Sequence, residues 1–307
     1  MRIVPWTTTS TAVPNPTTHE DIGMMPVEAH ATPLALQVQS AVRRGDVHIP
    51  PLPDVVTRIH ELLRNEDSAD ARRIAELVKS EPAIAASVLR VANSAAFGGL
   101  GAVGELDEAI ARIGLRQVGG LATAVGHKGH FESRDPERAR MLRVLWDHAV
   151  TTALAARRLA AMNGRDPAEA YLSGLLHDAG KLLALKGVDW LEKRSRAPLS
   201  DRIVGEILVL LHTDLGHHTL TAWKIAPSVC EVARDHHREA RADDSPTLIW
   251  VRAGNVISRK LGTHPQADPG MCLIERPEIE RLNLNDPELS ALLVDVEDDL
   301  DEVRNLL

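Results

Sequence analysis

The segment GLLHDAGKLL, residues 174–183, carries two adjacent residues whose side chains could do chemistry, His177 and Asp178. The surrounding residues are strongly apolar, and imidazole and carboxylate groups are costly to remove from water unless another group pairs with them. Two kinds of site would supply that pairing: a bound metal ion, or a polar core in which the groups hydrogen-bond to one another. We expect the segment to belong to one buried helix over residues 168–185.

Histidines are concentrated in the helices predicted from residue 136 onward. The chain has 14 His, and those in this region include His148, His177, His212, His217, His218, His236 and His237. Side chains that face inward from successive helices of a bundle can converge on one point. Neutral imidazole and carboxylate groups suit divalent iron, manganese or zinc. A single buried histidine is more often a hydrogen-bonded core residue, but several at one level beside Asp178 favour a metal site.

The elements that position these side chains are expected to be helices. The sequence is 44% hydrophobic and 25% charged, which is ordinary for a soluble globular protein of 307 residues. Aromatic residues are few, with five Trp, two Phe and one Tyr, while Ala and Leu dominate. This composition favours packed helices over sheets, because strands prefer aromatic and β-branched residues. The predicted fold class is all-α, a multi-helix bundle.

The overall charge excludes some classes of function. The formal net charge is −8 at pH 7, which argues against nucleic acid as a partner because phosphate contacts need clustered Lys and Arg. Short basic pairs such as Arg72-Arg73 and Arg157-Arg158 are expected on solvated helix faces. Cys230 and Cys272 are too few and too far apart for a disulfide framework or a thiolate metal site.

The sequence has no pattern of a membrane span or a secretion signal. Residues 1–20 lack the unbroken apolar core of a signal peptide, and no run of about 18 apolar residues occurs. We therefore expect a cytoplasmic protein that does not use a membrane as its partner.

Apolar periodicity and turn signals divide the chain into regions. Residues 1–32 are rich in Thr and Pro and are expected to form a flexible arm. The patterns that follow predict a succession of helices, at 34–45, 55–63, 69–80, 81–94, 105–114, 138–162, 168–185, 201–226, 227–237, 246–262 and 286–307.

Three of these regions carry packing predictions. The helix over 138–162 has a stripe of small residues that would let a neighbouring helix approach closely, at Ala149, Ala153, Ala156 and Ala160. The terminal helix is acidic and amphipathic, and is expected either to dock by its apolar face or to recruit a basic partner; that face is Leu292, Leu293, Val296 and Leu300. The junction at 126–137 is short and mixed, so the helices on its two sides are expected to form one continuous unit.

Several motifs together resemble a known family. They are IPPLPDVVTRI, SEPAIAASVLRVANSAAFG, LDEAIARIG, GLLHDAGKLL and the spaced set Glu206, His212, Gly216, Trp223 and His236-His237. With His148 on the preceding helix, they resemble the HD superfamily of metal-dependent phosphohydrolases. More specifically, the chain is similar to the HDOD domain, the HD-related output domain of bacterial signalling proteins. The resemblance covers roughly residues 48–262.

The resemblance implies a domain layout and a pocket. It implies an HDOD domain over 33–262, built from an N-terminal helical part, 33–135, and an HD-like part, 136–262, followed by an acidic helical extension over 263–307. It also implies that one pocket is surrounded by His148, His177, Asp178, His212 and His236, with His237 beside it. A divalent metal (Fe, Mn or Zn) is the cofactor that this pocket would take.

Two positions depart from the enzyme pattern. HD enzymes end their ligand set with an Asp on the last core helix, where this sequence offers Asn255. Arg238 follows the paired histidines, where the related HD-GYP phosphodiesterases have an acidic residue and then a glycine-rich segment. The loss of a carboxylate removes a charge that helps to hold a dication and to orient its bound water.

Two functions from different classes follow from the resemblance. We favour a bacterial signalling adaptor without catalytic activity, which acts through contacts with other signalling proteins and senses a nucleotide second messenger or a metal. The alternative is a degenerate metal-dependent phosphohydrolase that acts on a nucleotide phosphoester. The surviving histidines support the enzyme, whereas Asn255 and Arg238 support the adaptor.

Asn93 and Ser94 are candidate interaction residues. They follow an apolar helix and precede Phe97 and two glycines. One interpretation is a helix terminus whose polar side chains satisfy free backbone groups. The other is a surface that contacts a partner protein.

Overall fold

The computed structural model describes residues 31–49, 51–64, 71–93, 103–133 and 135–306. Every regular element in these ranges is a helix, which confirms the all-α prediction. The predicted N-terminal arm lies outside the described residues up to residue 30, and so does Ser94.

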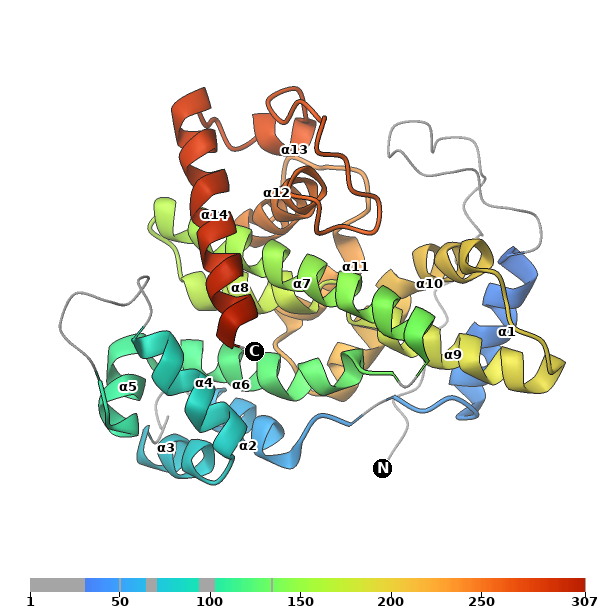
Figure 1. Ribbon diagram of the computed structural model, residues 1–307, viewed down its shortest axis with the longest axis horizontal. Helices are drawn as coiled ribbons and strands as arrows, with labels where there is room; N and C mark the ends of the chain where they lie inside the picture. Colours follow the sequence, from blue (N-terminus) through green and yellow to red (C-terminus); the bar gives the residue numbers. More distant parts are fainter. Residues whose placement is uncertain (1–30, 50, 65–70, 94–102, 134, 307) are drawn as a thin grey trace.

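The first part of the described chain consists of short helices. Their bounds are α1 (Ala31–Arg44), α2 (Asp54–Leu63), α3 (Ala71–Lys79), α4 (Pro82–Ala92), α5 (Leu106–Ile113), α6 (Leu115–Lys128) and the 3-10 turn η2 (Gly129–Phe131). Figure 1 shows α2 to α6 gathered along one side of the molecule, whereas α1 lies at the far end beside α9 and α10.

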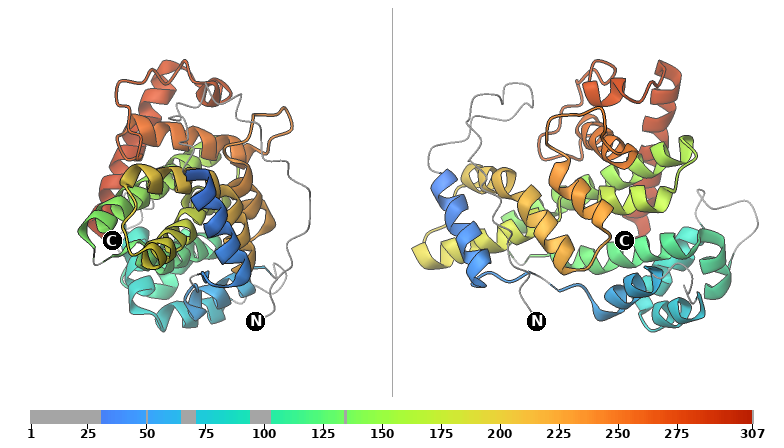
Figure 2. Two further views of the ribbon diagram at one scale, coloured as in Figure 1. Left: turned by 90° about the vertical axis from the view of Figure 1, so that its right-hand side faces the viewer. Right: turned by 180° about the vertical axis from the view of Figure 1, so that it is seen from behind.

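The second part consists mostly of longer helices. Their bounds are α7 (Pro136–Met162), α8 (Pro167–Leu176), α9 (Gly180–Ser195), α10 (Asp201–Ala222), α11 (Pro227–Asp235), α12 (Pro246–Lys260), α13 (Pro277–Glu280) and α14 (Asp286–Leu306). The longest, α7, crosses the middle of the molecule, with α2 to α6 on one side and α12 to α14 on the other (Figure 1). The view from behind shows the same arrangement (Figure 2).

Local sequence signals explain where the longer helices begin. The Asp135 and Asp166 side chains accept hydrogen bonds from backbone N–H groups in the first turns of α7 and α8, and each is followed by a proline. The Ser200 and Ser245 hydroxyls cap α10 and α12 in the same way. A capping side chain of this kind contributes about 1 kcal/mol, because it satisfies a backbone donor that the helix cannot.

One hydrophobic core joins the two parts of the chain. A single cluster of buried side chains extends from Leu52, before α2, to Leu300 on α14, and it includes residues of α6, α7, α8 and α12. A second cluster fills the space between α1, α9 and α10. Side chains of α7 belong to both clusters.

Small residues allow the helices to approach α7 closely. Its predicted stripe, Ala149, Ala153, Ala156 and Ala160, is buried throughout. On α8, a Cβ atom at Gly174 would lie 2.6 Å from the Ala153 Cα atom, and on α12 a Cβ atom at Gly254 would lie 2.8 Å from the Thr152 carbonyl oxygen. Both α8 and α12 can therefore contact the α7 backbone only because glycine stands at these two positions.

The prediction of a single helix over 168–185 is wrong. Helix α8 ends at Leu176 and α9 begins at Gly180, so His177 and Asp178 lie in the turn between two helices. A Cβ atom at Gly180 would lie 2.0 Å from the His212 carbonyl oxygen on α10. The chain therefore turns where α9 meets the α10 backbone, and this long-range contact has no counterpart in the local apolar pattern.

Other boundaries also differ from the prediction. Helix α6 was not predicted; its residues from Gln117 to Ala124 are all buried, so the segment lacks the polar face that makes a helix recognisable. It extends to Lys128, within the predicted junction at 126–137. The segment after 185, for which no helix was predicted, continues α9 to Ser195.

The acidic terminal helix docks on the bundle by its predicted apolar face. Leu292, Val296 and Leu300 are buried, and Leu293 packs against the same core. The expectation of a solvated Arg157-Arg158 pair is wrong. Both guanidinium groups donate to the Asp299 carboxylate on α14, at 3.0 Å from Arg157 Nη2 and 2.8 Å from Arg158 Nε.

None of the helices in the described ranges combines the length and the apolar character that a bilayer span requires.

Candidate metal centre

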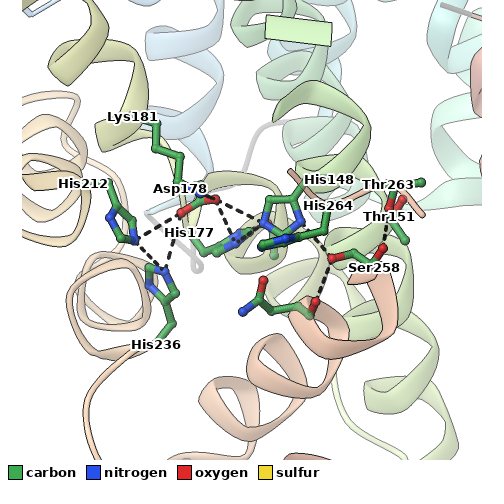
Figure 3. Close-up of polar contacts among 12 residues, drawn as sticks. His148, Thr151, His177, Asp178, Lys181, His212, His236, Ser258, Thr263 and His264 are labelled. Atoms are coloured by element: carbon green, nitrogen blue, oxygen red, sulfur yellow. Dashed lines mark hydrogen bonds and ion pairs between the residues drawn. The ribbon is translucent and has the colours of Figure 1, made fainter. Parts of the chain in front are cut away.

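Asp178 lies at the centre of a cluster of four buried imidazoles (Figure 3). Its position in the turn between α8 and α9 directs the carboxylate toward helices α7, α10 and α11. The Oδ2 atom lies 3.1 Å from His148 Nε2 and 3.5 Å from His177 Nε2, and the Oδ1 atom lies 3.5 Å from His212 Nε2 and 3.6 Å from His236 Nε2. The structure thus brings together the five residues that the sequence placed in one pocket.

The imidazoles also approach one another through the same nitrogen atoms. His148 Nε2 lies 3.0 Å from His177 Nε2, and His212 Nε2 lies 3.3 Å from His236 Nε2. The exposed His237 extends this second pair, because its ring centroid lies 5.0 Å from that of His212 and 4.2 Å from that of His236.

Backbone carbonyl groups fix the orientation of three of these rings. The Nδ1–H group of His177 donates to the Gly174 carbonyl oxygen at 2.6 Å, that of His212 to Leu208 at 2.9 Å, and that of His236 to Ala233 at 3.0 Å. A carbonyl oxygen only accepts, so Nδ1 holds the proton and a neutral ring presents an unprotonated Nε2. Each of these rings therefore directs a lone pair into the cluster.

Burial determines the charge of the cluster. It lowers the pKa of His212 to about 3 and also lowers the pKa values of His148 and His177, because the charged ring is poorly solvated there. Burial alone would raise the pKa of Asp178, but the Lys181 ammonium opposes it, and that pKa lies well below its usual value. Neutral imidazoles around an ionised carboxylate are the protonation states in which these groups bind metals.

The donor atoms fall into two groups that could each hold a metal ion. His148, His177 and Asp178 form one group, and His212, His236 and His237 form the other, with the ligand atoms of each group within 4.8 Å of one another. The two oxygen atoms of Asp178 face the two groups separately. Metal–nitrogen bonds of about 2.1 Å in a tetrahedral site place the ligand atoms about 3.4 Å apart, and the observed separations scatter around that value.

Lys181 and Asp178 form a buried ion pair that was not predicted from the sequence. The Lys181 ammonium donates a short hydrogen bond to Asp178 Oδ2 from one turn further along the chain. By contrast, Asp178 Oδ1 is buried and has no hydrogen-bond partner among the described residues. An anionic oxygen without a donor, close to unprotonated ring nitrogens, is a site that fits a cation.

Helix α12 contributes Ser258 to the site. Among the described residues, the Asn255 side chain forms no hydrogen bond with the cluster. The Ser258 hydroxyl donates to the Asn255 backbone carbonyl at 2.7 Å, and it lies 2.9 Å from His148 Nδ1, from which it can accept. Helix α12 therefore meets the cluster with a hydroxyl group, which lies one turn after Asn255.

His264 extends the row of imidazoles beyond the predicted set. Its ring centroid lies 4.7 Å from that of His148, on the side away from His212 and His236 (Figure 3). The Gln266 N–H group donates to His264 Nδ1 at 2.8 Å, so a neutral His264 has its proton on Nε2. The segment that carries His264 directly follows α12. There, the backbone N–H group and the hydroxyl group of Thr263 both donate to the Ser258 carbonyl oxygen.

The other predicted residues lie away from the cluster or serve the backbone. His217 and His218 are half-buried on α10 and belong to neither ligand group. The Asn93 side chain donates to the Leu89 and Val103 carbonyl groups at 2.9 and 2.8 Å, and it accepts from the Val103 N–H group at 2.7 Å. These bonds match the interpretation of Asn93 as a polar helix terminus.

Comparison with known proteins identifies relatives of the sequence. The HDOD domain family matches residues 49–239. An uncharacterised protein of Treponema pallidum is 28% identical over 245 residues, which cover 76% of this chain and 46% of the relative. The chain thus spans about half the length of this curated relative.

Solved structures with a similar fold agree with the arrangement of helices. An HDOD domain protein of unknown function from Geobacter sulfurreducens aligns over 90% of this chain and 99% of its own, with 18% identity and a TM-score of 0.66. A candidate metal-dependent phosphohydrolase from Shewanella amazonensis aligns over 88% of this chain and 100% of its own, with 19% identity and a TM-score of 0.67. At these identities the likeness concerns the fold.

Proposed function

The chain belongs to the HDOD domain family, and from this premise we propose that it is a signalling output domain that binds a divalent metal and acts through protein contacts without hydrolysing a phosphoester. The observation that carries the proposal is the composition of the cluster. Asp178 is the one carboxylate among the described residues that contacts the imidazoles, and Lys181 already pairs with one of its oxygen atoms.

This donor set fits metal binding better than catalysis. Asp178 and the imidazoles around it would hold the metal, and the bound metal would supply Lewis-acid chemistry. Hydrolysis also needs anionic groups that balance the metal charge and orient a water molecule. Ser258 and Lys181 also contact the cluster, and neither carries a negative charge. Among the described residues, the site therefore has several imidazole ligands and a single acidic one, Asp178.

A metal is a better candidate ligand than a nucleotide second messenger. A nucleotide phosphate would need free cationic donors, and the cation that contacts this cluster, Lys181, is engaged by Asp178. Neutral imidazoles and one carboxylate suit divalent Fe, Mn and Zn alike.

Helix α8 offers a route from the metal centre to the N-terminal helices. One of its ends leads into His177 and Asp178, and Tyr171 near its middle contacts α6, where a Cβ atom at Gly120 would lie 3.3 Å from the Tyr171 ring. A shift of the turn on metal binding would therefore be transmitted to α6. We propose that the surface of α2 to α6 is the part that contacts other signalling proteins.

A hydrolysis assay tests the absence of catalysis. The wild-type chain, loaded in turn with Mn²⁺, Fe²⁺ and Zn²⁺, is expected to hydrolyse bis(p-nitrophenyl) phosphate and a cyclic dinucleotide no faster than its Asp178→Ala variant. Each ion that binds should also raise the melting temperature of the wild-type chain and leave that of the variant unchanged. Hydrolysis by the wild type that the variant lacks would overturn the proposal.

The second candidate function is that of a degenerate phosphohydrolase. It is favoured by one observation: two groups of ligand atoms lie on either side of Asp178, as a two-metal site requires. The same assay separates it from the signalling function, because a degenerate enzyme would show metal-dependent turnover.

A further inference from the structure

The two ligand groups of the metal centre are not equivalent. We define the inner half-site as His148, His177 and Asp178 Oδ2, and the outer half-site as His212, His236, His237 and Asp178 Oδ1. The inner half-site is enclosed, with exposed fractions of 0% for His148 and 1% for His177. The outer half-site includes the exposed His237 and therefore has a ligand that solvent can reach.

The inner half-site already contains a cation, the Lys181 ammonium group. The Lys181 ammonium donates to Asp178 Oδ2, the oxygen atom that faces His148 and His177. A dication bound there would share this oxygen atom with the ammonium group, and the two positive charges would repel each other in a buried site where solvent screens them poorly. The inner half-site also offers only three donor atoms, two imidazole nitrogens and Oδ2.

In the outer half-site, by contrast, the carboxylate oxygen atom has no cation beside it among the described residues. Asp178 Oδ1 is buried without a hydrogen-bond partner among the described residues. It faces His212 Nε2 at 3.5 Å and His236 Nε2 at 3.6 Å, and these two nitrogen atoms lie 3.3 Å apart. Because the Nδ1 atoms of both rings donate to backbone carbonyl groups, two lone pairs and an anionic oxygen converge with no proton between them. A positive charge at this point would remove the repulsion.

Three donor atoms of the outer half-site are spaced as the ligands of one ion would be. Their three measured separations lie close to the value of about 3.4 Å that a tetrahedral ion with bonds of about 2.1 Å would give. His237 supplies a fourth donor atom, which lies within 4.8 Å of those of His212 and His236. Three imidazoles and one carboxylate oxygen are a donor set that suits zinc and similar divalent ions.

We propose that the chain binds one divalent ion, in the outer half-site, and that the Lys181 ammonium takes the place of a second ion in the inner half-site. The inference rests on the metal-binding part of the proposed function and adds which residues hold the ion. The centre would then contain one metal and one lysine on the two oxygen atoms of a single carboxylate.

Titration of the metal-free full-length chain with Co²⁺, followed by equilibrium dialysis and visible absorption, tests this assignment. We expect one Co²⁺ per chain, with the intense visible bands of a four-coordinate site. His237→Ala should remove most of this binding, whereas His148→Ala should retain one ion with the same spectrum. His217→Ala, on the same helix as His212, is the matched control and should bind as the wild type does. Circular dichroism of each variant checks that it is folded.

Lys181→Met tests the role of the lysine. This variant removes the ammonium group and keeps an apolar side chain of similar length. We expect it to bind two Co²⁺ ions per chain, the second of which should be lost when His148→Ala is added. A Lys181→Met variant that still binds one ion would overturn the role assigned to the lysine.

Four other results would overturn the assignment of the ion. The first two are binding of two ions by the wild-type chain and binding of none. The third is binding that survives in His237→Ala but is lost in His148→Ala, and the fourth is loss of binding in both variants when both are folded. Absence of binding would refute the assignment of the ion and the metal-binding part of the proposed function, but not the non-catalytic output role. Phosphoester hydrolysis by a chain with one ion in the outer half-site would refute only the proposed function. The two proposals can therefore fail separately.

Discussion

Arg252 on α12 donates a hydrogen bond from Nε to the backbone carbonyl of His236, at 3.1 Å. The same guanidinium group donates to the carbonyl oxygen atoms of Asp235 at 2.8 Å and Arg238 at 2.7 Å, and it pairs with the buried Asp244 carboxylate at 2.6 Å. One buried side chain on α12 thus holds the turn that carries His236 and His237.

We predict that Arg252→Met weakens metal binding even though Arg252 touches no metal ligand atom. The turn would lose its bonds to α12, and the loss of such an outer contact typically lowers metal affinity about 10- to 100-fold. Arg252→Lys should have a metal affinity between those of the wild type and Arg252→Met, because one ammonium group replaces only some of the hydrogen bonds of the guanidinium group. Competition with a chelator of known affinity measures the effect. Unchanged affinity in a folded Arg252→Met variant would show that the turn keeps its shape without this contact.

Gly180→Ala should disrupt the contact between α9 and α10. The added Cβ atom would lie 2.0 Å from the His212 carbonyl oxygen and 2.3 Å from the Gly216 backbone nitrogen, neither of which can rotate away. We expect a loss of unfolding free energy of about 3 kcal/mol, at the upper end of the range for overpacked cores. Urea denaturation measures it.

Gly205→Ala is the matched control for Gly180→Ala. Gly205 lies on α10, and a Cβ atom there would meet nothing within 4 Å. Alanine is the better helix former, so this variant should gain about 0.5–1 kcal/mol. If both variants lost stability equally, the clash at Gly180 would not be the cause.

The fully buried His127 should make the protein sensitive to acid. Neither of its ring nitrogens has a hydrogen-bond partner among the described residues, and its ring lies against those of Phe131 and Trp223. Burial, and then His130, lower the pKa of His127 to about 3, compared with about 6.5 in an unfolded chain. Because the unfolded state binds the proton first, stability falls as the pH decreases from about 6.5 toward 3.

We therefore predict that His127→Phe is more stable than the wild type at pH 5 by about 2 kcal/mol beyond any difference at pH 7.5. Phenylalanine keeps an aromatic ring in this environment and cannot take up a proton. Urea denaturation at the two pH values gives the comparison. An advantage of the same size at both pH values would mean that packing, and not protonation, separates the two proteins.

Asp299→Ala should loosen the terminal helix. Asp299 is 6% exposed and bonds to both Arg157 and Arg158 on α7. Its removal takes a buried carboxylate away from both guanidinium groups. Because Arg158 is partly exposed and also pairs with Asp295, the expected loss is limited to about 2 kcal/mol. Asp301→Ala is the control, since that side chain is 76% exposed and should change stability by less than about 0.5 kcal/mol. Equal effects of the two variants on the melting temperature would contradict a specific role for Asp299.

The sequence predicted most helices because their apolar residues recur at helical spacing, as in α7 and α14. It failed where burial is nearly complete, as in α6, and where the decisive contact is distant, as between Gly180 and His212. Local patterns contain no information about which backbone lies against a glycine.

The residues of the cluster could be predicted because the motifs that resemble the HD superfamily contain them. The helical pattern alone indicated only that histidines on successive helices could converge. The predicted residues are His148, His177, Asp178, His212 and His236. Lys181 was visible in the motif GLLHDAGKLL, but its role follows from the direction in which the turn between α8 and α9 points its side chain. Ser258 and His264 could not be found in this way, because a serine on an apolar helix and a histidine in a loop are common without any function.

The contacts of α7 also have a consequence for how much length variation its sequence can tolerate. His148 faces the metal centre, whereas Arg157 and Arg158 hold α14, and α8 and α12 contact the backbone between them at Thr152 and Ala153. One residue inserted between His148 and Arg157 would turn everything beyond it by about 100° around the helix axis. An insertion of about seven residues, two full turns, is the shortest that nearly restores the angular phase, and it would move the α14 contact about 10 Å along the axis. In α7, the number of residues between these contacts is therefore under stricter constraint than the identity of most of them.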